Sequence, residues 1–382
     1  YFKGAKMKKI GIATVYTGYN YGSVLQAFAT KKILSDMGYE AEILKINGSL
    51  VKGRDIRLKK LITIAWRSLL HKNGAKSLKN YSTSMSKEFK EGTVELFDEF
   101  INSEISPRLV SYRTLEKKAK NDEYAAFLCG SDQVWNSAVF YVDPFYYLRF
   151  APLEKRIAFA PSFGRDFVPD YNKKTIKKYI SEIKYKSVRE ASGVDIIKEL
   201  TGEDSTVLID PTLVLNRTEW VSLLNMKENN KGKYLLAYFL DSPSPKAQKA
   251  IHAISERYGL EIIGLPYIFK DSGINNVKNA GPCEFVEYVK NASFVCTDSF
   301  HGTAFSLNLN IPFFTFERKY GNGGNQSARI ESILKMTDHF NRYEVDDFES
   351  CMDISFEKSN TILDFERRRS KEYLASILEE RV

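Results

Sequence analysis

A strand, a helix and a second strand open the chain, and this order constrains the fold more than any other feature. Residues 9–15 are apolar and β-branched, and the loop 16–22 that follows ends in Gly22. Apolar residues then recur at helical spacing until Gly38, and residues 40–46 return to a strand pattern. Two strands joined by one helix pair in parallel with a right-handed crossover. The chain is therefore expected to build a parallel α/β sheet.

The same alternation continues to the end of the chain. Further strands are expected at 122–129, 156–161, 205–209, 234–240, 260–265, 292–296 and 313–316. A chain of 382 residues exceeds one ordinary core. We therefore expect two doubly wound, Rossmann-like α/β domains, at residues 7–185 and 186–355, followed by a closing helix at 356–382. Residues 1–6 look like the remainder of an expression tag.

Positive charge is concentrated in one segment. The net charge is +8, but residues 51–90 alone carry eleven Lys or Arg against Asp55 and Glu88. Apolar residues in this segment share one helix face: Leu58, Leu61, Ile62, Ala65, Trp66, Leu69 and Leu70. Either a helix at 56–72 lies in the interface of an anionic membrane, or its apolar face packs on the N-terminal domain. We favour packing, because isolated apolar stripes on helices are usually core. Nucleic-acid binding is not expected, because no binding motif accompanies the charge.

The cysteines and the hydropathy pattern bear on the cellular compartment. Four cysteines are scattered, with no CxxC pair and no metal-ligand spacing: Cys129, Cys283, Cys296 and Cys351. This predicts a reducing compartment, no disulfide framework and no metal site. No stretch is long enough to span a membrane, and no signal peptide opens the chain. We expect a cytoplasmic protein, peripheral at the inner face of the membrane if the basic segment binds lipid.

His301 is the strongest candidate for chemistry. It lies in the polar turn 297–303, between an apolar strand and the start of a helix. A turn at the carboxyl end of a strand is where α/β folds place ligands, against the positive ends of helices. Histidine side chains exchange protons near neutral pH, which suits a site beside a bound anion. The other three histidines, at 71, 252 and 339, lie in ordinary helical or loop contexts.

Six segments recur in an order that resembles one known family. They are GYNYGSVLQA at 18–27, CGSDQVWN at 129–136, SVRE at 187–190, DPT at 210–212, DSFHG at 298–302 and SARIES at 327–332. Each is weak alone, but together they resemble the polysaccharide pyruvyl transferase family over nearly the whole chain after Met7. The resemblance implies a fold like that of GT-B glycosyltransferases. It also implies transfer of a pyruvyl group from phosphoenolpyruvate to a sugar of a cell-surface polysaccharide or its lipid-linked precursor, usually as a cyclic ketal.

The resemblance places the donor in the C-terminal domain and the acceptor on the N-terminal side. Phosphoenolpyruvate is a compact trianion, so it needs fixed cationic forks and backbone N–H donors. Donor contacts are expected from Arg189, Ser299, Phe300, Gly302 and Arg329, with Arg165 as a further candidate. Acceptor contacts are expected from Asn20, Tyr21, Ser131 and Asp132. We expect His301 to alternate between acid and base, with Asp132 or Asp298 orienting it or accepting the sugar proton. No cofactor is expected beyond the donor substrate.

Ser299 departs from the family pattern. Better-studied members carry an arginine two residues before the matching histidine, and that arginine is thought to contact the donor. Either another cation takes its place here or the donor differs. Two alternative functions therefore stay open. One is a GT-B glycosyltransferase that binds a UDP- or GDP-linked sugar in the C-terminal domain, and the other is a non-catalytic sugar-binding relative.

Each candidate residue also has a structural interpretation. His301 can close a loop through hydrogen bonds, and Arg189 can pair with a neighbouring carboxylate. Asp132 is as well suited to cap the helix that follows it as to contact a sugar. Trp135 is interpreted as a core residue. Asp210, which precedes a proline, is interpreted as part of a turn at the domain junction.

Overall fold

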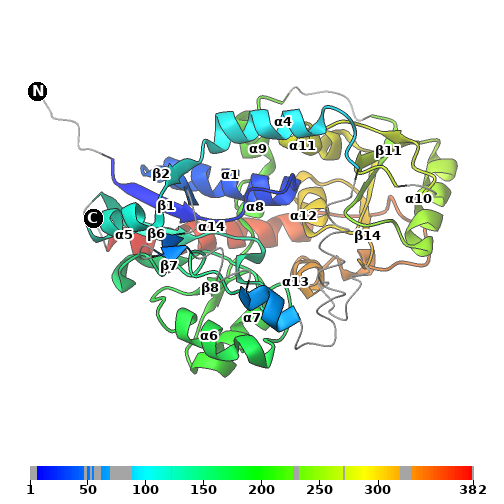
Figure 1. Ribbon diagram of the computed structural model, residues 1–382. Helices are drawn as coiled ribbons and strands as arrows, with labels where there is room; N and C mark the ends of the chain where they lie inside the picture. Colours follow the sequence, from blue (N-terminus) through cyan, green and yellow to red (C-terminus); the bar gives the residue numbers. More distant parts are fainter. Residues whose placement is uncertain are drawn as a thin grey trace, which may run out of the picture.

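Two α/β halves make up the molecule (Figure 1). The computed structural model describes residues 7–46, 50–51, 54–55, 62–68, 88–121, 123–226, 232–269, 272–318 and 328–380. Each half is built on a five-stranded sheet, of order β5-β2-β1-β6-β7 in the first half and β12-β11-β10-β13-β14 in the second. Every strand pair in these two sheets is parallel, as the alternation of strands and helices predicts.

The first sheet grows from the opening strand pattern. Its strands are β1 (Lys9–Ala13), β2 (Glu40–Ile46), β5 (Arg108–Val110), β6 (Tyr124–Cys129) and β7 (Arg156–Ala158). The helix α1 (Tyr21–Asp36) connects β1 to β2, and α5 (Tyr112–Lys120) connects β5 to β6. The chain adds β2 and β5 on one side of β1 and then returns to add β6 and β7 on the other. The strand order therefore reverses between β1 and β6.

The second sheet repeats this topology. Its strands are β10 (Tyr234–Phe239), β11 (Glu261–Pro266), β12 (Asn276–Val277), β13 (Phe294–Thr297) and β14 (Phe313–Thr315). The helix α10 (Pro245–Tyr258) connects β10 to β11, and α11 (Pro282–Asn291) connects β12 to β13. The helix α12 (Phe300–Leu309) connects β13 to β14. The helix α10 ends at Gly259 with a φ of 61°, a left-handed conformation that glycine adopts without strain. The strand order reverses between β10 and β13.

Successive residues of each strand face opposite sides of the sheet, and helices cover both sides. In β1, Ile12 packs in one core with α1, whereas Ala13 packs in another with α5 and α6 (Asp170–Ile180). In β10, Leu236 packs with α11 and α12, whereas Leu235 packs with α10. Both halves are therefore doubly wound. The prediction of two Rossmann-like units in a GT-B-like arrangement is confirmed.

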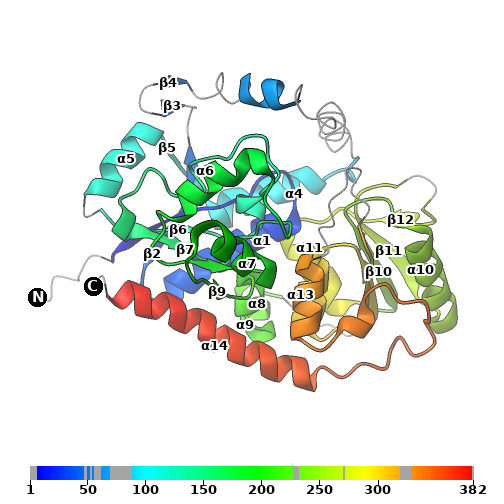
Figure 2. The same cartoon turned by 90° about the horizontal axis from the view of Figure 1, so that it is seen from below.

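The two halves share one continuous core and a closing helix. The core on the α1 side of the first sheet continues to the α11 and α12 side of the second. The helix α14 (Glu357–Glu379) begins beside the second half and ends beside the first (Figure 2). Its Arg367 donates to the carbonyl of Leu213 at 2.9 Å and to the side chain of Asn308 at 2.8 Å. This is the closing helix that the sequence predicts.

The domain boundary at residues 185/186 stays a prediction. The short strand β8 (Ser187–Val188) pairs with β9 (Thr206–Val207), and Tyr185 forms an isolated bridge with Ile157 of β7. The helix α7 (Ala191–Thr201) contributes buried side chains to the core that also holds α5 and α6. The residues just after 186 therefore pack on the first half, because their apolar side chains complete the core on that face of its sheet.

Residues 62–68, within the basic segment 51–90, form a helix. The Arg67 guanidinium fixes it by three hydrogen bonds to the first half, to the carbonyls of Phe140 and Tyr171 and to the side chain of Asn172. Ile62 and Trp66 are 58% and 65% exposed. The favoured interpretation, in which the apolar stripe packs on the N-terminal domain, is wrong for these two side chains, because it is Arg67 that holds the helix to the first half. The other leucines of the stripe, at 58, 61, 69 and 70, lie outside the described residues.

Candidate active site

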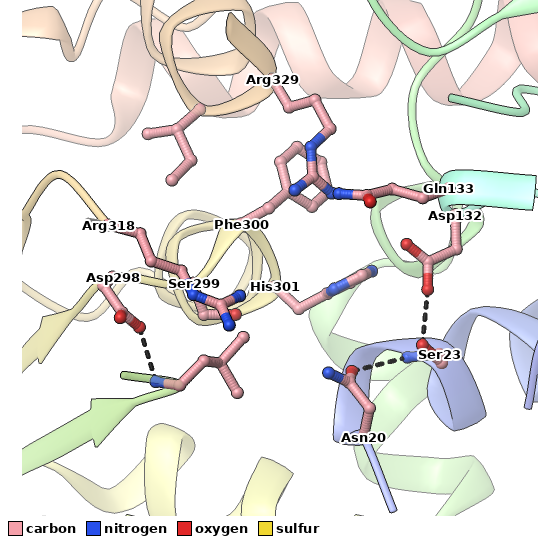
Figure 3. A pocket seen from close by; sticks show the side chains of 12 residues that line it. Asn20, Ser23, Asp132, Gln133, Asp298, Ser299, Phe300, His301, Arg318 and Arg329 are labelled. Atoms are coloured by element: carbon pink, nitrogen blue, oxygen red, sulfur yellow. Dashed lines mark hydrogen bonds between the residues drawn. The ribbon is translucent and has the colours of Figure 1, made fainter. Parts of the chain in front are cut away.

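A cavity of about 300 Å³ lies where the carboxyl ends of strands from both sheets meet (Figure 3). Its lining residues follow β1 and β6 in the first half, and β10, β13 and β14 in the second. The cavity therefore lies at both positions where the strand order reverses, between β1 and β6 and between β10 and β13. Open α/β sheets bind ligands at such positions. The lining residues are Asn20, Ser23, Asp132, Gln133, Leu240, Asp298, Ser299, Phe300, His301, Arg318, Arg329 and Ile330.

The start of α1 forms one wall of the cavity. Asn20 caps this helix, because its side-chain oxygen accepts from the backbone N–H of Ser23 at 3.1 Å. The hydroxyl of Ser23 donates to Asp132 Oδ2 at 2.5 Å. Gly22 lies in the same turn and leaves room for an imidazole, since a β-carbon added there would lie 1.8 Å from His301 Nδ1. The helix start therefore contacts both halves of the site.

Asp132 follows β6 in a backbone conformation that few residues other than glycine adopt. Its φ of 64° and ψ of −172° indicate strain of about 1–3 kcal/mol. Its side chain makes no cap to the following helix, so the cap interpretation is wrong, and the carboxylate faces the cavity instead. Arg189 Nη2 lies 3.8 Å from Asp132 Oδ1. Burial opposes the charge of this carboxylate, but Arg189 and His301 outweigh burial and lower the pKa of Asp132.

The predicted strand, turn and helix around His301 are β13, residues 298–299 and α12. Ser299 caps α12 by accepting from the N–H of Gly302 at 3.4 Å, and its own N–H donates to Thr297 Oγ1 at 3.0 Å. Gly302 has no space for a side chain, because a β-carbon there would lie 2.4 Å from Thr297 Oγ1. The turn presents Ser299, Phe300 and His301 to the cavity. Gly302 lies behind them and does not line it.

The imidazole of His301 lies at the cavity wall on the side of Asp132 (Figure 3). The residue is only 5% exposed. Its Nε2 is 3.6 Å from Asp210 Oδ2 and has no hydrogen-bond partner among the described residues. One nitrogen of His301 therefore faces a carboxylate while the ring borders the cavity, an arrangement that suits proton transfer.

Asp210 is the centre of a buried ion network behind His301. Its Oδ2 accepts from Arg189 Nη1 at 2.5 Å and from the hydroxyl of Ser131 at 2.9 Å. Burial opposes ionisation, but His301 and Arg189 outweigh burial and hold the pKa of Asp210 well below its ordinary range. The predicted turn is present, because Asp210 caps the short helix α8 (Pro211–Val214). Its role in the ion network was not apparent from the sequence.

Arg189 lies behind the cavity wall. Its side chain is 2% exposed, and its guanidinium lies over the Phe300 ring at 4.4 Å. Arg189 does not line the cavity, because its guanidinium packs against the Phe300 ring and its Nη1 donates to Asp210, so the structure does not show the expected direct donor contact. Its pairing with a neighbouring carboxylate is confirmed. Arg329 lines the cavity and lies 6.0 Å from the same Phe300 ring.

Asp298 and Arg318 form the opposite end of the cavity (Figure 3). The Asp298 carboxylate accepts from the backbone N–H groups of Leu240 at 2.7 Å and Asp241 at 3.1 Å. Burial raises the pKa of Asp298 to about 6, although Arg318 and the two backbone donors act in the opposite direction. Arg318 Nε donates to Asp241 Oδ2 at 2.6 Å. Asp298 is therefore a fixed, backbone-anchored carboxylate.

Two residues expected to contact the acceptor lie in the core. Tyr21 is 1% exposed, stacks on Phe285 with ring centroids 4.5 Å apart, and donates its hydroxyl to the carbonyl of Ala280 at 2.8 Å. It points away from the cavity, because the first turn of α1 directs it into the shared core. Ser131 is fully buried and bonds Asp210 instead of facing the cavity. Both expectations are corrected.

Five lining residues were not predicted from the sequence: Ser23, Gln133, Leu240, Arg318 and Ile330. Arg318 follows the end of β14 by three residues, so the rule that identified His301 at the end of β13 also identifies this cation. Arg165, a further donor candidate, does not line the cavity. Trp135 is a core residue as interpreted, with no exposed surface and a ring stacked on Tyr147.

Across the described ranges, no three or more His, Cys, Asp and Glu side chains are grouped so as to hold a metal ion. None of the helices that the structure describes combines the length and the apolar character needed to cross a membrane.

Solved structures with a similar arrangement share little sequence with this chain. The UDP-GlcNAc 2-epimerase from Neisseria meningitidis, bound to UDP-GlcNAc, is 9% identical with a TM-score of 0.47, over 97% of this chain and 100% of that one. The corresponding epimerase from Methanocaldococcus jannaschii is 13% identical with a TM-score of 0.43, over 91% and 98%. The E. coli heptosyltransferase with ADP is 11% identical with a TM-score of 0.35, over 86% and 98%. Likenesses this distant assign no activity.

A family comparison is more specific. No curated protein matches the chain. The model of the family described as polysaccharide pyruvyl transferase matches residues 20–320. This range includes the α1 wall, Asp132, Asp210 and the His301 turn. Because the match spans most of the sequence, the chain belongs to the polysaccharide pyruvyl transferase family.

Proposed function

We propose that this protein moves a pyruvyl group from phosphoenolpyruvate to a sugar of a cell-surface polysaccharide, or of its lipid-linked precursor, and closes a cyclic ketal. The observation that carries the proposal is the position of His301. Its imidazole borders a cavity that also contains the carboxylate of Asp132 and the guanidinium groups of Arg318 and Arg329. A proton donor, a base and two cations in one cavity are what this reaction requires.

The cavity suits a small anionic donor. Its volume of about 300 Å³ is at the lower end of the range for ligand sites. Arg318 and Arg329 reach it from the second half, and guanidinium groups bind carboxylate and phosphate through paired hydrogen bonds. In this proposal Arg318 and Arg329 bind the donor in place of the arginine that Ser299 replaces. No other cofactor is needed.

The chemistry balances with the residues in the cavity. His301 donates a proton to the methylene carbon of phosphoenolpyruvate, and one sugar hydroxyl attacks the neighbouring carbon while Asp132 accepts its proton. The carbon–oxygen bond to phosphate then breaks, and the proton on Asp132 leaves with the phosphate. A second hydroxyl adds to the same carbon and returns a proton to His301. The products are a cyclic ketal and inorganic phosphate.

Asp132 is better placed than Asp298 to accept the sugar proton. The Asp298 oxygens are engaged by two backbone N–H groups across the cavity, whereas Asp132 lies on the same side as His301 (Figure 3). The attraction between Asp132 and the charges of Arg189 and His301 keeps this carboxyl ionised, as a base must be. Asn20 and Ser23 lie beside it and provide polar atoms for the acceptor.

The test is phosphate release from phosphoenolpyruvate in the presence of an acceptor glycan. His301→Gln keeps a polar side chain of similar size but cannot carry a proton between atoms, so turnover is expected to fall by a factor of about 10²–10⁴. Thermal unfolding would show that the variant remains folded. Undiminished turnover in folded His301→Gln would overturn the assignment.

The alternative functions predict different binding. A nucleotide-sugar glycosyltransferase would be stabilised in a thermal-shift panel by UDP- or GDP-linked sugars and not by phosphoenolpyruvate. A non-catalytic sugar-binding relative would bind the acceptor and release no phosphate with any donor. Stabilisation by phosphoenolpyruvate, together with its turnover, is the result expected here.

A peripheral membrane contact on the cytoplasmic side is part of the proposal. A lipid-linked acceptor would lie in the membrane interface, and Ile62 and Trp66 project from the helix 62–68 with most of their surface exposed. Arg67 fixes the orientation of this helix. The segment 51–90 carries the positive excess that anionic lipid attracts.

A further inference from the structure

Asp210 is a buried carboxylate that the proposed reaction does not use directly. It is 1% exposed and does not line the cavity. One carboxylate oxygen is fixed locally, because Oδ1 accepts from the backbone N–H of Thr212 at 3.0 Å and from its hydroxyl at 2.8 Å. These bonds at the start of α8 leave Oδ2 directed to the rest of the network. Asp210 is thus fixed through Oδ1, and its Oδ2 contacts the other members of the network.

That single oxygen joins three separate elements. Ser131 follows β6, Arg189 follows β8 and His301 lies on α12, and all three direct a polar hydrogen or nitrogen at Asp210 Oδ2. The first two belong to the half that holds Asp132, and the third belongs to the other half. Oδ2 therefore sits where the two walls of the cavity meet behind the imidazole.

The contact between His301 and Asp210 is within ion-pair distance but is too long for a hydrogen bond. Nε2 lies 3.6 Å from Oδ2, and contacts of catalytic groups are often long without substrate and shorten in the complex. On the Nδ1 side the ring packs against Gly22, because a β-carbon added there would lie 1.8 Å from Nδ1. Asp132 and Arg189 are the other charged groups that face this region. Because Nε2 faces Oδ2, Asp210 can fix the ring by an electrostatic contact, and Nδ1 is left as the nitrogen that exchanges protons with the substrate.

We propose that Asp210 is the positioning residue for His301: it orients the imidazole by binding the Nε2–H group, and it holds Arg189 beneath Phe300 with the same oxygen. The inference rests on the proposed function only in taking His301 as the reacting group. A carboxylate behind a histidine fixes its tautomer and stabilises its charged form without touching substrate. Ser131 limits the movement of Oδ2 and completes the positioning.

The test is Asp210→Asn, which keeps the shape and removes the charge. In protein labelled with ¹⁵N-histidine, the Nε2–H resonance of His301, assigned by its absence in His301→Gln, is expected to be visible in the parent protein and lost in Asp210→Asn. With substrates, kcat for phosphate release is expected to fall about 100-fold or more, while KM for phosphoenolpyruvate changes little. An unaltered Nε2–H resonance in folded Asp210→Asn would overturn the proposal.

A second variant and a control keep the test decisive. If Asp210→Asn does not fold, Thr212→Val removes the hydroxyl that fixes Oδ1 and leaves the carboxylate, and it should weaken the same resonance and lower kcat less. Glu42→Gln breaks another partly buried ion pair, with Lys9, far from the site, so it should lower thermal stability and leave the resonance unchanged. The resonance requires no substrate. Its behaviour therefore tests Asp210 even if phosphoenolpyruvate proves not to be the donor.

Discussion

The imidazole of His301 packs directly on the α-carbon of Gly22, and no side chain would fit between them. A β-carbon at Gly22 would lie 1.8 Å from Nδ1, 2.2 Å from Cγ and 2.4 Å from Cε1 of His301. Gly22 belongs to the first turn of α1 in the first half, whereas His301 begins α12 in the second. The side chain proposed to transfer protons is therefore in contact with the opposite wall of its own cavity.

Gly22→Ala is expected to displace the His301 ring or the start of α1. Either movement separates the imidazole from Asp210 and Asp132, so phosphate release should fall by about 100-fold, the scale of losing general acid–base catalysis. Initial rates with phosphoenolpyruvate and acceptor measure the effect. Gly38→Ala is the control at the other end of α1, where φ is 86° and nothing lies near the added carbon. It should cost about 1 kcal/mol of stability and leave the rate of folded protein unchanged.

Asp132→Gly should remove activity with little change in stability. Asp132→Gly relieves the unfavourable φ of 64°, worth about 1–3 kcal/mol, and loses the hydrogen bond from Ser23, worth about 1.5–3 kcal/mol when the acceptor is charged. The midpoint of thermal unfolding should therefore change little, while phosphate release is lost. Asp132→Asn retains the strained backbone and also loses the base. A fully active Asp132→Asn would remove Asp132 from the mechanism.

The sequence located the site because strand ends are recognisable, but it could not give the direction of side chains around them. Asn20 and Tyr21 are neighbours in one turn, yet Asn20 lines the cavity and Tyr21 stacks in the core. Ser131 and Asp132 also diverge, because the positive φ of Asp132 lies outside the regular strand geometry that a sequence pattern assumes. Only the packing of the whole fold decides which of two neighbours faces the ligand.

Contacts between side chains far apart in the chain also could not be predicted from the sequence pattern. Asp210 was predictable as a turn, because aspartate before proline starts turns and short helices. That its carboxylate meets Arg189 and His301 depends on how α8 packs between α1 and α12. Trp66 is a similar case, because helical periodicity alone favoured burial and the three hydrogen bonds of Arg67 fix the helix in another orientation.

Arg318 and Arg329 are expected to set the affinity for the donor. Replacing either by Gln removes a charge-assisted hydrogen bond worth about 1.5–3 kcal/mol, so KM for phosphoenolpyruvate should rise roughly 10- to 100-fold. The effect on kcat should be smaller than in His301→Gln. Lys335→Gln, on the same helix as Arg329 but 60% exposed, is the control. Equal effects of Lys335→Gln and Arg329→Gln would show a loss of general charge instead of a donor contact.

Trp66 allows membrane binding to be measured without a label. The other two tryptophans, at 135 and 220, have no exposed surface, whereas Trp66 is 65% exposed. Vesicles that contain phosphatidylserine should therefore shift tryptophan emission to shorter wavelength, and Trp66→Ser should abolish the shift and reduce co-sedimentation. Phe365→Ser, which removes an exposed aromatic residue from α14, should bind as the parent does. Equal binding to vesicles of phosphatidylcholine alone would contradict the role of charge.

Asp298 should make stability depend on pH in a defined window. Burial raises its pKa to about 6 in the folded protein, from 3.8 as the ordinary value. The folded state therefore holds this proton more tightly than the unfolded state, and the contribution of Asp298 is complete below about pH 4 and is lost as the pH rises through about 6. The change is on the order of 3 kcal/mol. Urea unfolding between these values should show that Asp298→Asn loses this part of the pH dependence.

The matched control is an exposed carboxylate. Asp204 has a side chain that is 92% exposed, so Asp204→Asn should retain the slope of the parent protein over the same pH range. Asp298→Asn is expected to be less stable than the parent at low pH, because an amide cannot accept from Leu240 and Asp241 as the carboxyl does. The difference in the free energy of unfolding between the parent and Asp298→Asn should narrow as the pH approaches 7, because only the parent must ionise a buried group. Parallel slopes for the parent and Asp298→Asn would show that Asp298 is already ionised at low pH and that its two backbone donors outweigh its burial.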